Sequence, residues 1–523
     1  MHGRRVLVSG MGGELGSLVA SLLEGEPWVG AILGIDVDPP RRRLRRSEFH
    51  LIDPSDNARI ADVVTRFDPH VLIHLAVWEP DARAGTTAAK RLTSQACHSI
   101  LAAAAEAPSL ESIIARSGIE IYGRGRGALT RPDEDAPINP SSTYGRMLLE
   151  VESVARDVGE RAGVSVGILR LAPVLGPHLP SPLGRVLRQP AVPFSLLANS
   201  PFTVVIDSDA ARAFVVAASQ GATGPLNVVA PGAISTMQAI RRGRRLPIPL
   251  VGPEWLFARQ VSYLLGAPVP EHVMELIHRG RLADGPRFRS ACDRARGHRP
   301  PLQVGSHRSD PDDAGGLTMG AVIRLPSSWY PTDSVDEWGR DAHLIERLTP
   351  FAAMRWSVDV GGAHHLPKRS GALLVTNSWR FALNTIYSAW ALSDATGRPV
   401  RFGGRSDIAP FGPVMQRIGG LLGSPAEIGG ALRAGQLVIV SAASSAHPRR
   451  AGAVDPALIA ASLAAGTAIH PVASVSTPFG RAARVEVGQQ VRVRVRQRPL
   501  DDVELAGLVQ RQIQQLIDGA GES

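Results

Sequence analysis

The chain has 523 residues, a length that favours two or three domains. Its composition, 44% hydrophobic and 20% charged, is that of an ordinary globular protein. No run approaches the ~18 consecutive apolar residues that a membrane-spanning helix needs, and the first residues lack the apolar core of a signal peptide. Cys97 and Cys292 lie far apart, which argues against a disulfide framework and a cysteine-rich metal site. We therefore expect a reducing, cytoplasmic location and no metal.

The basic residues are almost all arginine. Of 57 lysine and arginine residues, only Lys90 and Lys368 are lysine, and the net charge is +9. This skew is typical of a GC-rich genome, so we expect no nucleic-acid partner. The positive charge leaves open a peripheral contact with an anionic membrane. The shortage of lysine also limits which residues can act as catalytic cations.

The first half of the chain alternates short apolar strands with helical patterns. We predict strands at residues 5–9, 31–36, 48–52, 71–76, 112–115 and 164–171. Because helical patterns separate most of these strands, the alternation predicts a parallel sheet with helices on both faces. The expected fold class is α/β, with a Rossmann-type doubly wound parallel sheet.

The pattern changes after about residue 279. Residues 286–323 are polar and rich in proline and glycine, which predicts a linker between a first domain at 1–285 and a second α/β domain at 324–523. The last periodic segment, 501–518, predicts an amphipathic helix that packs on its own domain. An interfacial membrane helix is the alternative.

A glycine-rich turn follows the first predicted strand and opens a helix. In it, Gly10 would permit the tight turn, Gly13 would let backbone amides approach a diphosphate, and Gly16 would let the helix pack closely on the strand. Asp36 ends the second strand, where a carboxylate accepts from a ribose 2′-hydroxyl and repels a 2′-phosphate. These residues predict a dinucleotide site that prefers NAD to NADP. The arginine run 41–46 could instead hold a phosphate, although we expect a solvated loop there.

Residues 1–285 resemble the extended short-chain dehydrogenase/reductase family of NAD-dependent epimerases and dehydratases. The resemblance rests on the glycine turn and on further motifs in the family's order: Asp53, His74-Leu75-Ala76, Tyr122-Gly123, Tyr144, Leu169–Pro173, Gly176-Pro177, 207–213 and 224–228. The last two segments extend the match through the family's small substrate lobe. The resemblance implies that Asp53 lies beside the adenine and Ala76 beside the ribose. It also implies a nucleotide-sugar substrate and a homodimer formed through helices that flank the sheet.

The catalytic residues of that family are only partly present. The family uses Tyr-x-x-x-Lys, in which the lysine lowers the pKa of the tyrosine, but here Tyr144 is followed by Leu148 at the lysine position. A tyrosine with its ordinary pKa of ~10 is a poor base at neutral pH. Arg146 lies on another face of the helix. Gly118 stands at the position of the family's serine or threonine, so the neighbouring Ser117 is the other candidate.

Residues 345–520 resemble the glycerol-phosphate (lysophospholipid) acyltransferase family in their layout. The matching segments are 357–378, 398–402, 413–423, 432–440, 465–472 and 485–488. That family carries a catalytic His-x4-Asp and a Pro-Glu-Gly segment. Ser378, Leu383 and residues 441–444 occupy those positions here. The resemblance therefore implies an acyltransferase-like domain without the family's base.

Two domains that keep their scaffolds and lose catalytic residues point to a binding or regulatory role. The leading hypothesis is an NAD-occupied pseudoenzyme joined to a degenerate acyltransferase-like domain, which acts as a nucleotide sensor or scaffold in lipid or envelope-glycan metabolism. The first alternative is an active NAD-dependent nucleotide-sugar epimerase, dehydratase or reductase that uses Tyr144 and Ser117. The second is a lipid acyltransferase with relocated catalytic groups that acts on an acyl-lipid.

Overall fold

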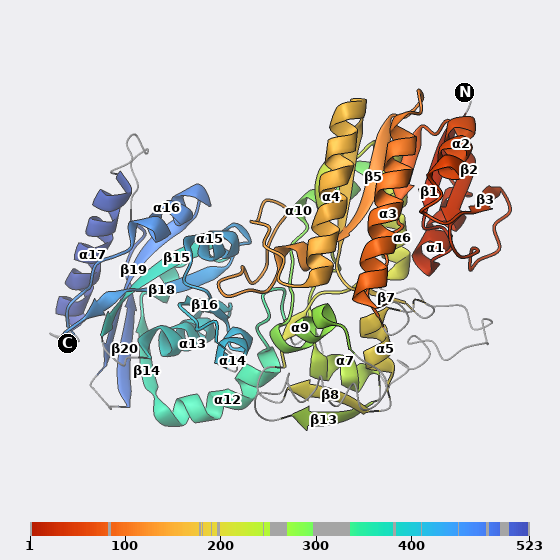
Figure 1. Cartoon of the computed structure of the whole chain (residues 1–523). Coiled ribbons are helices and arrows are strands. Elements are labelled where there is room, and N and C mark those ends of the chain that lie inside the picture. Colours follow the sequence, from red (N-terminus) through yellow and green to blue (C-terminus); the bar gives the residue numbers. More distant parts are fainter. Residues whose placement is uncertain are drawn as a thin grey trace. The chain divides into compact units, whose positions relative to one another are not determined.

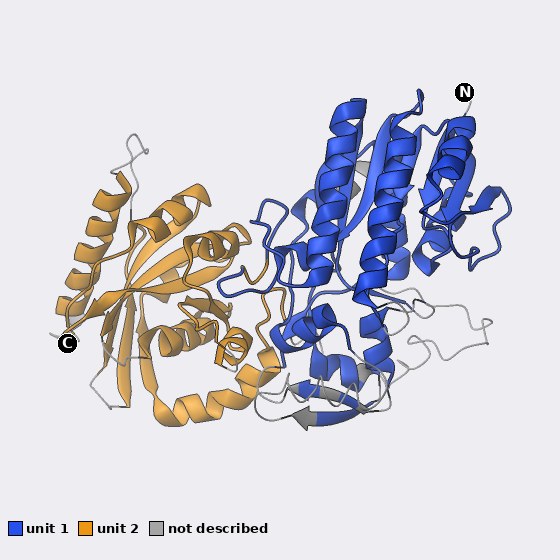
Figure 2. Ribbon diagram, in the orientation of Figure 1, with its two compact units in different colours: residues 1–128, 132–332 blue, residues 129–131, 333–523 orange. Residues whose placement is uncertain are grey.

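The computed structural model describes residues 3–81, 85–176, 179, 181–189, 191–195, 199–243, 245–250, 269–296, 335–379, 383–408, 411–447, 449–476, 481–491 and 501–520. The chain forms two compact units (Figure 2). Unit 1 comprises Met1–Ala128 and Pro132–Thr332, and unit 2 comprises Leu129–Arg131 and Asp333–Ser523. Each unit has a sheet and a hydrophobic core of its own.

Unit 1 is built on a seven-stranded sheet in which every pair of neighbours is parallel (Figure 1). The strands are β1 Arg4–Ser9, β2 Val29–Asp36, β3 Ser47–Leu51, β4 Val71–His74, β5 Ser112–Gly118, β6 Ser165–Leu171 and β11 Gly224–Val228. Their order in the sheet is β11-β6-β5-β4-β1-β2-β3. Since β2 lies on one side of β1 and β4 on the other, the strand order reverses next to β1.

Helices pack on this sheet in two groups. They are α1 Glu14–Leu23, α2 Asn57–Phe67, α3 Thr86–Ala105, α4 Thr143–Ala162 and α6 Asp207–Gln220. Helix α3 packs against α2 and α4, whereas α1 packs against α6. Strand β4 is buried along its whole length and β1 along most of it, which is why both read as apolar runs in the sequence. The predicted doubly wound parallel sheet is confirmed.

Helix α4 carries Tyr144 and has well-defined ends. Ser142 is its N-cap, and the hydroxyl of Ser142 accepts a hydrogen bond of 3.1 Å from the Gly145 amide. Gly163 ends the helix in the left-handed conformation with φ of 67°, where a side chain would introduce strain. These two residues fix the helix so that Tyr144 falls in its first turn.

The remaining strands of unit 1 form small pairs of their own. Strand β7 Val174–Leu175 pairs with β10 Val205–Ile206, β9 Pro201–Phe202 with β12 Ile234–Ser235, and β8 Ala191–Ser195 with β13 Leu246–Leu250. The other helices among the described residues of unit 1 are η1 Ile119–Tyr122, α5 Pro182–Arg188, α7 Thr236–Arg242, α9 Glu271–Arg279 and α10 Pro286–Arg296. A separate hydrophobic cluster joins α5, α7 and α9 through Leu183, Ile240 and Leu276.

Two expectations about this half of the chain are corrected by the structure. Residues 286–296, expected to begin the linker, form α10, which packs against β11. The segments 207–213 and 224–228, expected in a small substrate lobe, belong to the main layers: the first begins α6 and the second is the edge strand β11, paired with β6. The rest of the expected linker, 297–323, lies outside the described residues.

Unit 2 has a second seven-stranded sheet, and this one is mixed. Its strands are β14 Ser357–Gly361, β15 Ala372–Trp379, β16 Val400–Gly403, β17 Gly420–Leu421, β18 Leu437–Ser445, β19 Ala468–Ser476 and β20 Ala482–Val487. The order is β14-β20-β19-β15-β18-β16-β17, with β19 and β20 antiparallel and the other neighbours parallel. The helices are α12 Ala342–Arg355, η3 Ala363–His365, α13 Asn384–Thr396, α14 Phe411–Arg417, α15 Pro425–Arg433, α16 Pro456–Ala464 and α17 Asp501–Ala520.

Both faces of the second sheet are covered. In β15, Leu373 and Val375 join one hydrophobic cluster, whereas Ala372 and Leu374 join another. Because successive side chains of a strand point to opposite faces, the two clusters lie on opposite sides of the sheet. The second half is therefore a layered α/β unit, as predicted, although its acyltransferase-like character stays a prediction.

The C-terminal helix α17 packs on the second sheet. Its apolar residues Leu505, Val509, Ile513 and Ile517 are buried in the first of these clusters, and the helix contacts β19. The prediction that this helix packs on its own domain is therefore confirmed. Within the described ranges, no helix combines the length and the apolar content needed to cross a membrane.

The end of β4 carries a buried histidine that should make stability depend on pH. His74 is fully buried, and its Nδ1 shares a hydrogen bond of 2.8 Å with the hydroxyl of Ser9. Burial lowers the pKa of this imidazole from 6.5 to about 4. Between these values the unfolded chain binds the proton and the folded protein does not. The stability linked to His74 is therefore fully present above pH 6.5 and is lost as the pH falls toward 4.

When the pH falls from 7 to 4.5, we expect the free energy of unfolding to fall by on the order of 3 kcal/mol because of the shifted pKa of His74. Urea titrations at the two pH values should show this loss in the wild type and a much smaller loss in His74→Gln. The exposed His98 is the matched control, since His98→Gln should keep the full dependence. Equal pH dependence in wild type and His74→Gln would contradict the assignment.

Candidate functional site

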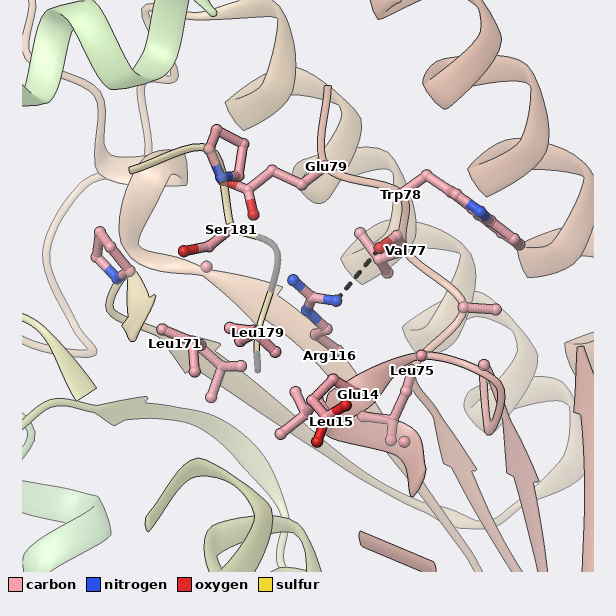
Figure 3. Close-up of a pocket in the computed structure, with 18 of the residues that line it drawn as sticks. Glu14, Leu15, Leu75, Val77, Trp78, Glu79, Arg116, Leu171, Leu179 and Ser181 are labelled. Carbon is pink, nitrogen blue, oxygen red and sulfur yellow. Dashed lines mark hydrogen bonds between the residues drawn. The ribbon is translucent and has the colours of Figure 1, made fainter. Parts of the chain in front are cut away.

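A pocket of unit 1 gathers residues from the carboxyl ends of the parallel strands (Figure 3). It is lined by Gly10 after β1, Asp36 at the end of β2, Ala76 after β4, Arg116 near the end of β5 and Leu171 at the end of β6. These strands lie on both sides of the reversal next to β1. In doubly wound sheets, ligands bind in the crevice at this point.

The turn between β1 and α1 needs two of its glycines for its own packing. Gly10 has a φ of 75°, and a Cβ there would lie 2.6 Å from the carbonyl carbon of Leu75. A Cβ on Gly16 would lie 2.0 Å from the carbonyl oxygen of Gly10. Side chains at these positions would force the strand, turn and helix apart.

Gly13 differs from the other two, because a Cβ there would meet no protein atom closer than 3.5 Å. Gly13 lines the pocket and is the N-cap of α1, where it supplies no side-chain cap. The backbone amides of the first helical turn are therefore left for a ligand, and the positive end of the helix dipole favours an anion there. This bare helix start fits the diphosphate of a dinucleotide.

Asp36 is held by the same turn. Its Oδ2 accepts a hydrogen bond of 2.8 Å from the Gly12 amide, and its Oδ1 accepts one of 2.6 Å from the Val37 amide. Burial raises the pKa of the Asp36 carboxyl above its ordinary value, while these amides act in the opposite direction. The carboxylate lines the pocket with Asp38, where it can accept hydrogen bonds from ribose hydroxyls.

Of the arginine run 41–46, only Arg41 lines the pocket. Arg42 instead forms an ion pair of 3.0 Å with Glu14 at the start of α1. Arg41 is exposed and lines the same pocket as Asp36. The prediction of a solvated loop therefore holds for only part of this run, because Arg41 could contact a ligand in the pocket.

Of the two residues expected beside the adenosine, one lines the pocket. Ala76 lines it and is buried. Asp53 is exposed and is not among the lining residues; its Oδ1 accepts hydrogen bonds from the amide and the hydroxyl of Ser55 at 2.9 and 2.6 Å. These two bonds hold the pKa of Asp53 below its usual value. A contact between Asp53 and the adenine stays a prediction.

Tyr144 lines the pocket from the first turn of α4 and is 6% exposed. Its ring lies 4.6 Å from the ring of His272, at an angle of 40°. Nε2 of His272 lies 2.9 Å from Oε1 of Glu79, which lines the pocket as well. The phenol therefore lies beside a histidine–carboxylate pair that the sequence motifs did not indicate.

The structure also places the residues at the positions of the family's lysine and serine. Leu148 is fully buried in the core. Ser117 lines the pocket, and its hydroxyl donates a hydrogen bond of 2.6 Å to Oε1 of Glu152. The catalytic role of Ser117 stays a prediction. A Cβ on Gly118 would lie 2.3 Å from Oε2 of Glu120. The Glu120 carboxylate thus fills the space of the missing serine or threonine side chain.

Arg116 is the functional candidate that sequence reasoning missed. It comes from β5, and its Nη1 donates a hydrogen bond of 3.2 Å to the carbonyl of Val77 (Figure 3). Its guanidinium lines the same pocket as Tyr144 and lowers the pKa of that phenol, which burial raises. A signal was present, because a charged residue near the carboxyl end of a central parallel strand is a common position for site residues.

The positions in unit 2 that correspond to the motifs of the acyltransferase family lie on two strands and at the start of a helix. Ser378 belongs to β15, residues 441–444 belong to β18, and Leu383 is the exposed N-cap residue of α13. Asn377 is buried, and its side chain bonds to the backbone of Ser474 at 2.7 and 2.9 Å, which ties β15 to β19. Across the described part of the chain, no group of three or more His, Cys, Asp or Glu side chains is arranged to hold a metal ion.

The first part of the chain is similar to known proteins. Residues 6–222 match the model of the NAD dependent epimerase/dehydratase family. Uncharacterized protein Rv0501 of Mycobacterium tuberculosis is 31% identical over 255 residues, and the match covers 47% of this chain and 68% of that protein. Uncharacterized protein Mb0513 of Mycobacterium bovis has the same identity and coverage.

Several solved structures are also similar. MoeE5 in complex with UDP-glucuronic acid and NAD is 21% identical, with a TM-score of 0.44 and coverage of 55% of this chain and 92% of MoeE5. UDP-glucose 4-epimerase of Thermotoga maritima with UDP-glucose is 17% identical, with a TM-score of 0.42 and coverage of 48% and 87%. These similarities are too low to assign roles to residues.

Proposed function

The chain belongs to the NAD dependent epimerase/dehydratase family, and from this premise we propose that unit 1 binds NAD in the pocket beside Tyr144. One observation carries the proposal: Gly10, Gly13, Asp36 and Ala76 come from separate segments and line a single pocket with Tyr144. The diphosphate would rest on the first turn of α1, and the adenosine ribose would bond to Asp36.

The proposed reaction begins with the oxidation of a hydroxyl group on a nucleotide sugar. Bound NAD supplies an acceptor for the hydride that leaves the substrate carbon. Tyr144 lines the pocket and would take the hydroxyl proton as its phenolate. The C–H and O–H bonds break as the carbonyl bond forms. Glu79 and His272 lie beside Tyr144 and are placed to pass the proton onward.

A second candidate function is the nucleotide sensor or scaffold without turnover. It is favoured by the burial of Leu148 at the lysine position and by the bond that commits Ser117 to Glu152. The two candidates differ in one measurement. Conversion of bound NAD to its reduced form in the presence of UDP-glucose, followed at 340 nm, supports the enzyme, and its loss in Tyr144→Phe assigns the reaction to Tyr144.

For unit 2 we retain the proposal of a degenerate acyltransferase-like module. Its support is the layout of β14, β15 and β18 at the segments that resemble that family. Acyl-lipid binding, peripheral contact with an anionic membrane, cytoplasmic location and a homodimer belong to the same proposal. Activity toward an acyl-lipid through relocated catalytic groups has less support. His365, which precedes β15 and could act as a relocated base, has its Nδ1 bonded to the carbonyl of Val487 at 3.0 Å.

The choice between NAD and NADP can be tested at Asp36. In Asp36→Asn the charge is lost and the shape is kept, so we expect NAD affinity to fall about tenfold or more, because a hydrogen bond to a charged group contributes roughly 1.5–3 kcal/mol. Affinity for NADP should rise relative to NAD, since the repulsion of a 2′-phosphate is removed and Arg41 lines the same pocket. Isothermal titration calorimetry with each dinucleotide measures both changes.

Glu48→Gln is the matched control for this charge change. Glu48 is an exposed carboxylate on β3 that bonds to His50, outside the pocket lining. Its replacement should leave both affinities unchanged. An unchanged ratio of NAD to NADP affinity in Asp36→Asn would contradict the assignment of Asp36 to the ribose.

A further inference from the structure

We propose that Arg116 is the positioning residue of this site, supplying from β5 the positive charge that Tyr144 would otherwise lack. The inference rests on the proposed NAD site and names the residue that prepares its tyrosine. It departs from the Tyr-x-x-x-Lys arrangement, because the cation comes from a neighbouring strand and not from the helix that carries the tyrosine.

The geometry of Arg116 supports this role. Its side chain lines the pocket together with Tyr144, and the hydrogen bond from Nη1 to the Val77 carbonyl at 3.2 Å fixes its direction (Figure 3). The charge of the guanidinium lowers the pKa of the Tyr144 phenol, which burial raises. The guanidinium of an arginine carries a positive charge, so a cation lines the pocket together with Tyr144.

The other basic residues of the catalytic end are poorly placed. Arg146 lies on α4 but is exposed, and its Nη2 donates to the hydroxyl of Thr143 at 3.0 Å. Lys90 is exposed on α3, and neither residue lines the pocket. Leu148, at the lysine position, is fully buried and apolar. Of these residues, Arg116 is the one that lines the pocket with Tyr144, whereas the buried Arg281 is paired with Glu120 at 3.1 Å.

The charges around Tyr144 show why a cation is needed. Burial raises the pKa of the phenol well above its ordinary value, the Arg116 guanidinium lowers it, and the carboxylates of Glu79 and Glu120 raise it. The ring of His272 packs against the phenol and is bonded to Glu79. Without Arg116 the phenolate would lie in a buried site beside two carboxylates, of which Glu120 is paired with Arg281 at 3.1 Å, and it would rarely form there.

The chemical consequence concerns one proton. In the proposed oxidation the substrate O–H bond would break and its proton would go to the Tyr144 phenolate, while the C–H bond would break as the C=O bond forms and bound NAD would supply the acceptor for the hydride. Arg116 neither gains nor loses a proton in this step. It acts through Tyr144, by stabilising the phenolate that must exist before the step begins.

The test measures the ionisation of Tyr144 directly in the full chain. A fluorinated tyrosine, whose phenol ionises at lower pH than that of tyrosine, is incorporated at position 144 and titrated by fluorine NMR. In Arg116→Met we expect the ionisation constant of this phenol to fall about tenfold or more, since an opposite charge at this range shifts a pKa by roughly 1–3 units. Arg116→Lys should restore most of the wild-type value.

Two further variants make the result decisive. Arg146→Met removes the same charge from an exposed site two residues after Tyr144 and should leave the titration unchanged. Arg116→Gln keeps a donor for the Val77 carbonyl without the charge, so it replaces Arg116→Met if that variant does not fold. A wild-type titration in a folded, neutral Arg116 variant overturns the proposal. Calorimetry of the wild type with NAD tests the proposed function separately, because the titration is made without nucleotide.

Discussion

Replacing Gly13 with aspartate should abolish NAD binding while leaving the protein folded. We expect the affinity to fall at least about a hundredfold, because the new carboxylate takes the place of the diphosphate at the start of α1 and repels it. Folding should be unaffected, since the nearest protein atom to a Cβ at Gly13 is 3.5 Å away. Calorimetry with NAD measures the affinity, and thermal unfolding measures the stability.

The backbone conformation of Gly13 should let aspartate replace it without disturbing the fold. Gly13 is the N-cap of α1, with φ of −68° and ψ of 160°, a conformation that aspartate adopts readily. Aspartate is a preferred N-cap residue and stabilises a helix by a few tenths of a kcal/mol relative to glycine. The melting temperature should therefore stay the same or rise slightly as the affinity is lost, so misfolding cannot account for the loss.

Gly25→Asp is the matched control at the other end of the same helix. Gly25 is exposed, and a Cβ there would also meet no protein atom closer than 3.5 Å. The variant adds the same charge just beyond the C-terminus of α1, far from the predicted diphosphate site, and should bind NAD normally. Wild-type affinity in Gly13→Asp would remove the basis of the proposed nucleotide site.

The parts of the fold that the sequence predicted are those with a strong local signal. The six predicted strands are all present, within a few residues of their predicted ends. They were recognisable because a parallel strand that is buried on both faces must be apolar along its length, as in β4. The glycine turn was recognisable for a similar reason, since at Gly10 and Gly16 the packing excludes any side chain.

The expected linker was wrong at its start because α10 has a weak apolar signal. The helix, Pro286–Arg296, carries four arginines. Among its described side chains, Phe288 packs against the core of unit 1 and Ala291 is buried. Such a sequence has no clear helical period. The one local signal was Pro286, a residue favoured in the first turn of a helix. Residues 224–228, which form β11, were wrongly predicted to lie in the substrate lobe, because no local sequence pattern shows which sheet a strand joins.

The catalytic end of the pocket could not be predicted, because its groups come together only through the fold. Arg116 and Glu120 lie near the expected motif, but they are not the residue types that the motif contains. His272 comes from α9, far along the chain, and its contact with Tyr144 has no sequence signal. Motifs therefore located the cofactor end of the pocket, because backbone packing there requires particular residue types. At the reactive end, residues on several different elements can provide the same charge.

The other variant with a large expected effect is Arg170→Met, which should destabilise unit 1. Arg170 is 1% exposed, and its Nε and Nη2 each donate a hydrogen bond of 2.9 Å to the two oxygens of Glu152, which is fully buried. Its Nη1 donates to the hydroxyl of Tyr122 at 2.8 Å, and that hydroxyl bonds to Asn227 on β11. Arg170 thereby joins β6, α4 and the edge of the sheet.

Removing the arginine would leave the Glu152 carboxylate buried without its main partner. Breaking a buried ion pair from one side costs about 3–5 kcal/mol, and we expect the free energy of unfolding of unit 1 to fall by this amount in urea titrations. Arg156 contacts the same carboxylate from the surface, with its side chain 39% exposed. Arg156→Met should therefore cost less than about 1 kcal/mol.

The double variant Arg170→Met with Glu152→Met separates the loss of a favourable contact from the cost of a stranded charge. If the charge dominates, the double variant should be more stable than Arg170→Met alone, because apolar pairs of similar volume can replace a buried ion pair at little cost. The Ser117 hydroxyl would lose its acceptor in this variant, so full recovery is not expected. If the double variant is as unstable as the sum of the two single variants, the stranded charge is not the cause. In that case the stability contributed by Arg170 would lie in its bond to Tyr122.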